Sequence, residues 1–181
     1  MLRKIYYMIS IICIVNFLSA NEDVYANPQN PPPSFEEKYT QIGYKSVEES
    51  VKEFESFFKE DVNLPKITPS ISFTHKYGRF YEDKKYDTND FLEIQFVNKE
   101  SSENNYKIDI RPLENKLTFK GKSNQEEYTL QNGTKAIYFE DQLFNFLVFE
   151  KNNLQYMLGI NKKVSNKVTP DNLVQIANSI E

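Results

Sequence analysis

The stretch from Thr134 to Ile160 constrains the fold most strongly, because it holds the densest apolar run of the sequence and is typical of three consecutive strands. Within it, the segment from Phe144 to Phe149 predicts a strand that is apolar on both sides. One side would carry Phe144, Phe146 and Val148, and the other Leu147 and Phe149. We therefore expect this strand near the middle of a sheet, with helices covering both of its faces.

Residues 1–26 are typical of a secretory signal peptide. Arg3 and Lys4 give a positive n-region, Ile5 to Leu18 form an apolar run, and Val24 to Ala26 offer a small-residue cleavage site. The apolar run is shorter than the roughly 20 residues that span a bilayer. The sequence therefore predicts a secreted or extracytoplasmic protein, which contacts a membrane only if this segment stays uncleaved.

Composition excludes several classes of function. The single cysteine, Cys13, lies in the signal segment, so the mature chain has no disulfide framework, thiolate zinc site or cysteine nucleophile. The net charge of -4 and the sequence pI near 5.3 argue against a nucleic-acid binder, because the phosphate backbone requires a basic surface. We predict no cofactor and no metal site.

After the signal segment the sequence predicts a spacer and then a capped helix. Residues 27–45 begin with NPQNPPPS, which favours extended polyproline geometry, so we expect them to form a proline-rich spacer. A helix should begin at Ser46, where Ser46 and Glu49 match a capping box, and end near Lys59. Its apolar stripe is formed by Val47, Val51, Phe54 and Phe58.

The last part of the sequence predicts a second helix. Thr169 is a suitable N-cap, Pro170 fits the first helical position, and Asp171 complements the helix dipole. The apolar stripe of this helix is formed by Leu173, Ile176, Ala177 and Ile180.

Between the two helices the sequence is rich in strand and turn signals. Alternation predicts half-exposed strands over residues 92–97 and 106–111, and shorter strands over 117–119 and 127–130. Asn132-Gly133 predicts a type I′ hairpin turn, and Asn152-Asn153 the turn between the last two strands. The expected fold for residues 46–181 is one α+β domain: an antiparallel sheet of about six or seven strands in a largely meandering order, covered by an N-terminal and a C-terminal helix.

The most chemically mixed segment runs from Ser70 to Tyr81, and we name His75, Tyr77 and Arg79 within it as candidate ligand-binding residues. Strand alternation would place these three side chains on one face together with Phe73. A bulge at Gly78 would reverse the alternation beyond it. An arginine here suits bidentate recognition of a carboxylate. An ion pair of Arg79 with nearby Glu82 or Asp83 is the more ordinary expectation.

His75 is the only histidine, and its sequence context supports three interpretations. As a general base it requires an orienting carboxylate and a nucleophile, and Glu93 or Asp109 are the carboxylates that a sheet would bring close. As a metal ligand it requires further ligands, but no HxxxH or HxH spacing exists. As a structural residue it would form hydrogen bonds beside an aromatic core, and we favour this interpretation.

A loose set of core and turn positions resembles the domain-of-unknown-function family numbered 4367, an uncharacterised family of exported Firmicute domains. The matching positions are Leu64-Pro65, Pro69, Asn132-Gly133, Ala136-Ile137-Tyr138, Phe149, Tyr156, Leu158, Leu173, Ile176-Ala177 and Ser179-Ile180. The chain departs from the family in having Phe149 where a tryptophan is frequent and Asn152-Asn153 where Asp-Gly is frequent. The resemblance implies an extracellular portion of a sporulation or anti-sigma protein and supplies no catalytic residues.

These observations favour a non-enzymatic exported binding or sensing module of the bacterial cell envelope, and the family resemblance implies a link to sporulation. Its partner would be an envelope protein or a cell-wall component. A secreted hydrolase that uses His75 with sheet carboxylates is the alternative. A carbohydrate-binding face of exposed tyrosines is a third hypothesis.

Overall fold

The computed structural model describes residues 31–84, 89–119, 122 and 124–181, and residues 34–181 form one compact unit. The predicted signal peptide lies outside the described residues. No helix in the described part of the chain has the length and apolar character needed to cross a membrane.

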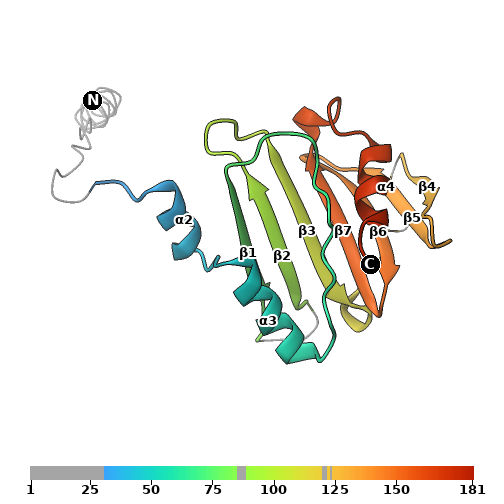
Figure 1. Cartoon of the computed structure of the whole chain (residues 1–181), viewed down its shortest axis with the longest axis horizontal. Coiled ribbons are helices and arrows are strands. Elements are labelled where there is room, and N and C mark those ends of the chain that lie inside the picture. The colour runs from blue at the N-terminus through green and yellow to red at the C-terminus, as the bar shows by residue number, and fades with distance from the viewer. Residues whose placement is uncertain (1–30, 85–88, 120–121, 123) are drawn as a thin grey trace, which may run out of the picture. The chain divides into compact units, whose positions relative to one another are not determined.

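The compact unit is built on a single seven-stranded antiparallel sheet, which confirms the predicted α+β class (Figure 1). The strands are β1 (His75–Tyr81), β2 (Phe91–Val97), β3 (Asn105–Pro112), β4 (Glu126–Thr129), β5 (Lys135–Glu140), β6 (Phe144–Lys151) and β7 (Leu154–Asn161). Their order in the sheet is β1-β2-β3-β7-β6-β5-β4. Two meanders, β1–β3 and β4–β7, therefore meet where β3 pairs with β7.

In the described part of the chain, three α-helices flank the sheet: α2 (Phe35–Gln41), α3 (Val47–Phe58) and α4 (Pro170–Asn178). Short 3-10 turns follow β3 at Leu113–Asn115 and β7 at Lys162–Val164. Both predicted helices are present with their predicted caps. The Ser46 hydroxyl accepts the Glu49 backbone N–H at 3.2 Å, and Thr169 caps α4 through a reciprocal box with Asn172.

Helices α3 and α4 lie on the same face of the sheet, with residues 59–74 crossing between them (Figure 1). We call this side the first face and the opposite side the second face. Phe54 of α3 is fully buried, as is Leu173 of α4, and each contributes about 2 kcal/mol through its burial. The strand residues beneath them form one core that includes Leu92, Ile94, Tyr106, Ile108, Ile110, Leu147, Phe149, Tyr156, Leu158 and Ile160.

The expectation that helices cover both faces of the Phe144–Phe149 strand is wrong. Leu147 and Phe149 point into the core of the first face, with 0% and 2% exposure. Phe144 and Phe146 lie on the second face and are only half-buried. The physical reason is that each helix has a single apolar stripe, and the first face is wide enough to receive both stripes.

The compact unit begins at Ser34 rather than at Ser46, because part of the predicted spacer is helical. Ser34 and Glu37 form a capping box that starts α2 directly after the proline run. Phe35 and Tyr39 then pack against β1 on the second face, with the Tyr39 ring stacked 4.4 Å from that of Tyr77. The chain next rounds the edge of β1 through backbone hydrogen bonds between Lys45 and Gly78, and enters α3 on the first face.

Two local predictions are also wrong. Residues 117–119 form no strand, because Leu117 is hydrogen-bonded to the Gln155 side chain instead of a neighbouring strand. The type I′ geometry belongs to Asn152 and Asn153, with φ of 50° and 59°, and not to the Asn132-Gly133 turn. In that turn only Gly133 has positive φ, and its N–H donates to the Leu130 carbonyl at 2.9 Å.

Gly78 forms no bulge, since β1 keeps continuous register with β2 from His75 to Tyr81. Its role is to let α3 approach the sheet. A Cβ at this position would lie 2.8 Å from the Ser50 Cβ and 3.0 Å from the Val47 Cα. Ser50 is itself fully buried at this contact.

We predict that Gly78→Ala lowers the free energy of unfolding by about 1–3 kcal/mol, because the added methyl group overpacks the contact between α3 and β1. Urea unfolding measures the change. The matched control is Lys76→Ala, at an exposed position of the same strand, which should change stability by less than about 0.5 kcal/mol. Equal stability of the two variants would contradict this role of Gly78.

Candidate functional site

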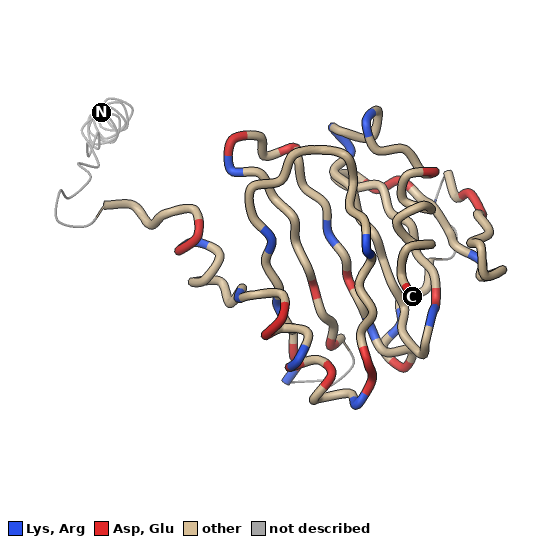
Figure 2. Tube along the Cα trace, viewed as in Figure 1, with Lys and Arg blue, Asp and Glu red and all other residues tan. Residues whose placement is uncertain are grey.

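The second face carries charged side chains in the middle of the sheet, where a covered face would be apolar. Acidic and basic positions occur within β1, β2 and β3 as well as in the loops (Figure 2). We call this set of side chains the polar strip; it consists of Arg79, Glu93, Gln95, Lys107, Asp109 and Arg111. The strand register places Arg79 opposite Glu93, and Glu93 opposite Asp109.

The centre of the polar strip is a buried pair of carboxyl groups on neighbouring strands. Glu93 and Asp109 are 7% and 3% exposed. Lys107 Nζ lies between them, 3.7 Å from Glu93 Oε2 and 3.1 Å from Asp109 Oδ2. The Tyr44 hydroxyl also donates to Glu93 Oε1, and Gln95 Nε2 donates to the same oxygen at 3.3 Å. The single ammonium group of Lys107 thus lies within ion-pair distance of both carboxyl groups.

Burial alters the acid-base properties of these groups. Loss of solvent raises the pKa of Asp109 to about 6; the Glu93 charge adds to this, while Lys107 opposes it. Asp109 Oδ1 is buried and has no hydrogen-bond partner among the described residues. Burial and the hydrogen bond to Glu93 raise the pKa of Tyr44, so that phenol stays protonated and acts as a donor.

Two arginines enclose an aromatic pair at one end of the polar strip. The rings of Tyr81 and Phe91 stack 4.5 Å apart, with Arg79 Cζ 4.0 Å from the Tyr81 centroid and Arg111 Cζ 4.1 Å from the Phe91 centroid. Rings this close leave no space between them, so the guanidinium groups occupy the two outer sides of the stack. Within the described chain neither arginine forms an ion pair with a carboxylate.

The structure brings the three predicted site residues together on the second face. His75, Tyr77 and Arg79 alternate along β1, and Tyr77 stacks with His75 at 5.8 Å. The Tyr77 hydroxyl is buried without a hydrogen-bond partner among the described residues. The placement of Phe73 beside them was wrong, because Phe73 precedes the strand and packs against Phe96 and Tyr106 on the first face.

His75 does not meet the carboxylates that the hydrolase hypothesis requires. Its Nε2 lies 2.8 Å from Glu36 Oε1 of α2, and its Nδ1 lies 2.7 Å from Thr74 Oγ1. Val97, not Glu93 or Asp109, lies opposite His75 on β2. His75 therefore acts in this arrangement as a contact that holds α2 to the sheet.

The tyrosines that the structure describes do not form the exposed platform of the carbohydrate hypothesis. Every tyrosine among the described residues is buried or half-buried. Near α2, the flat faces of Tyr39 and Tyr77 cover each other, so they are not free to stack on a sugar ring.

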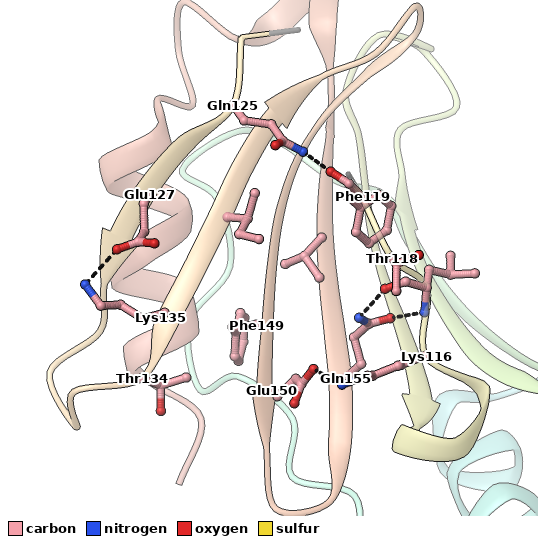
Figure 3. A pocket seen from close by; sticks show the side chains of 13 residues that line it. Lys116, Thr118, Phe119, Gln125, Glu127, Thr134, Lys135, Phe149, Glu150 and Gln155 are labelled. Atoms are coloured by element: carbon pink, nitrogen blue, oxygen red, sulfur yellow. Dashed lines mark hydrogen bonds and ion pairs between the residues drawn. The ribbon is translucent and has the colours of Figure 1, made fainter. Parts of the chain in front are cut away.

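A groove of about 580 Å³ lies at the other end of the second face (Figure 3). One wall is the segment 116–119, and β5 and β6 contribute the floor. The backbone of Leu117 donates to Gln155 Oε1 at 2.8 Å, and its carbonyl accepts from Gln155 Nε2 at 2.9 Å. Phe119 stacks on Phe139 at 4.8 Å. The wall is therefore anchored to the sheet at two points.

Sequence reasoning missed both the burial of the polar strip and the groove. Alternation identified Glu93, Lys107 and Asp109 as the polar side of their strands, but a half-exposed strand predicts solvated charges. One signal for a buried polar cluster was available: two predicted strands that follow each other in the chain carry two acidic residues and a lysine on their polar sides. No group of three or more histidine, cysteine or acidic side chains that could hold a metal ion occurs in the described part of the chain.

No family model matches the chain, and no similar protein was found among curated proteins or among solved structures. The resemblance to the domain-of-unknown-function family numbered 4367 therefore stays a prediction.

We predict that Asp109→Asn raises the free energy of unfolding at pH 7–8 by on the order of 1–3 kcal/mol. The folded-state pKa of Asp109, about 6, lies above its ordinary value of 3.8. At pH values between 3.8 and about 6, the folded protein therefore binds more protons than the unfolded chain. The contribution of Asp109 to stability is thus greatest at low pH and is lost as pH rises through about 6. Urea unfolding of both proteins from pH 4 to pH 8 measures the difference.

The stability of the asparagine variant should increase relative to that of the parent protein as pH rises from 4 to 8. The control Asp61→Asn, at an exposed loop position, should follow the parent protein at every pH. If the difference between Asp109→Asn and the parent protein does not change with pH, Asp109 is not the buried titrating group that its surroundings indicate.

Proposed function

We propose that this protein is an exported, non-enzymatic binding module of the bacterial cell envelope, and that its partner docks on the second face of the sheet. The signal-peptide pattern of residues 1–26 supports export. The contacts of His75 with Glu36 and Thr74 support a structural use of the only histidine. A role in sporulation, which the family resemblance suggests, is part of the same proposal.

The observation that carries the proposal is the buried polar strip. Removing charged groups from water costs several kcal/mol per ion unless each is paired and hydrogen-bonded, and an apolar sheet face would be less costly. Here two carboxyl groups share Lys107, and Asp109 Oδ1 lacks a partner among the described residues. Such an arrangement weakens the fold, so we infer that it is retained for recognition.

The chemistry of the strip indicates what the partner presents. Arg79 is half-buried on the edge strand, and its guanidinium contacts aromatic rings rather than a carboxylate of the described chain. A planar guanidinium held by a ring is suited to a bidentate carboxylate. Tyr77 lies next to Arg79 on this face, and its hydroxyl is buried without a hydrogen-bond partner among the described residues. We therefore propose a carboxylate-bearing envelope protein or cell-wall component.

The hydrolase alternative receives less support from the geometry. His75 would have to act without Glu93 or Asp109 as its orienting carboxylate. Both nitrogens of its ring already form hydrogen bonds, with Thr74 and Glu36. Purified protein that hydrolysed peptidoglycan, peptide, ester or phosphate substrates, and lost this activity in His75→Ala, would contradict the binding-module proposal.

We predict that a photo-crosslinking amino acid in place of Gln95 captures a specific envelope component when the full-length protein is exported in its native host. Gln95 lies in the polar strip, directly opposite Tyr77 and Lys107. The matched control places the same amino acid at Lys52, an exposed position of α3 on the first face. Mass spectrometry of the adducts identifies what is captured.

Arg79→Ala should reduce the yield of the position-95 adduct by about tenfold, because a charge-assisted hydrogen bond is worth roughly 1.5–3 kcal/mol. Lys76→Ala, on the other side of the same strand, should leave the yield unchanged. Equal adduct yields from positions 95 and 52 would exclude the second face as the docking surface. A position-95 yield that does not change in Arg79→Ala would exclude it as well.

A further inference from the structure

The groove at the β4–β6 end of the second face has the properties of a second ligand site. Two of its apolar side chains, Leu117 and Ile137, remain 37% and 38% exposed, although Val148, which also lines the groove, is buried. Its volume of about 580 Å³ falls in the range of small-molecule sites, roughly 300–1,000 Å³. Adjacent exposed apolar side chains in a concave surface mark a place where apolar ligand area is buried.

The wall of this groove is held in position by a buried polar contact. Gln155 is 4% exposed and sits on β7, the central strand. Its amide uses both its oxygen and its nitrogen on the Leu117 backbone. The position of Leu117 over the sheet is therefore fixed before any ligand arrives, which reduces the entropy cost of binding.

The charges around the groove determine the charge of its ligand. Four charged side chains of the described residues line it, and they form two ion pairs: Lys116 Nζ with Glu150 Oε1 at 2.9 Å, and Lys135 Nζ with Glu127 Oε1 at 2.7 Å (Figure 3). Among the residues that the structure describes, no charge in the lining is left to pair with an ionised ligand. A charged group entering the groove would lose water without gaining a counter-ion.

We propose that the groove binds an uncharged aliphatic chain, as found in a neutral lipid or a long-chain alcohol. The branched side chains of Leu117, Ile137 and Val148 provide the apolar contact, and Thr118 and Thr134 are the uncharged hydroxyl-bearing residues of the lining. This site is separate from the polar strip, and the proposal does not depend on the partner that docks there.

The test uses the neutral fluorescent reporter N-phenyl-1-naphthylamine and a matched pair of competitors, 1-decanol and decanoate. The reporter should bind, and 1-decanol should displace it at a concentration at least about tenfold lower than decanoate. Ile137→Asp places an unpaired carboxylate in the groove and should weaken reporter binding by about tenfold or more. Leu143→Asp changes a leucine that is 73% exposed and outside the groove lining, and should leave binding unchanged.

Thermal unfolding of both variants shows whether each remains folded, as expected for substitutions at partly exposed positions. Absence of reporter binding, equal competition by 1-decanol and decanoate, or equal binding by the two variants would overturn the proposal. Photo-crosslinking from position 95 should persist in Ile137→Asp, so failure at the groove is distinguishable from failure at the polar strip.

Discussion

The pairing of β3 with β7 is the contact on which the rest of the structure depends. It joins the β1–β3 meander to the β4–β7 meander, and it is the one neighbour relation in the sheet that connects the two. On the first face it aligns Tyr106 with Ile160, Ile108 with Leu158, and Ile110 with Tyr156, all fully buried or nearly so. The two apolar surfaces therefore become a continuous core that α3 and α4 can cover together.

The same junction gives the second face two different ends. The β1–β3 meander brings the polar strip, with α2 bound at its outer edge through Tyr39 and His75. The β4–β7 meander brings the groove, whose wall is anchored by Gln155 on β7. A partner with a charged group would thus bind at one end of the second face, and a neutral aliphatic ligand would bind at the other end. The two proposed sites share a scaffold without sharing residues.

Local sequence signals predicted most of the elements and few of their spatial relations. Alternating residues and capping boxes identified the strands and the two long helices, because these patterns depend on near neighbours in the chain. The helical start at Ser34 was hidden by the preceding proline run, which suggested a spacer instead. The face chosen by each helix, and the anchoring of residues 117–119 by Gln155, depend on contacts distant in sequence, which no local pattern contains.

The candidate site was predictable to the same limited extent. Alternation along β1 correctly grouped His75, Tyr77 and Arg79 on one face, because side-chain period is a local property of a strand. The burial of Glu93 and Asp109 was not predictable, since it depends on which strands become neighbours and on what packs over them. Those two carboxyl groups became part of the site only through the register between β2 and β3.

Gly159 explains how the charged and apolar ends of the second face coexist. A Cβ at this position would lie 2.7 Å from Phe146 Cε1 and 3.1 Å from Lys107 Cγ. The missing side chain therefore lets the lysine stem and the phenylalanine ring meet across β7, with Lys107 Nζ 5.6 Å from the Phe146 centroid. The apolar stem of Lys107 is covered by this contact while its ammonium group reaches both Glu93 and Asp109. Partial neutralisation of the buried acidic pair thus depends on a glycine in the opposite meander, which again depends on the pairing of β3 with β7.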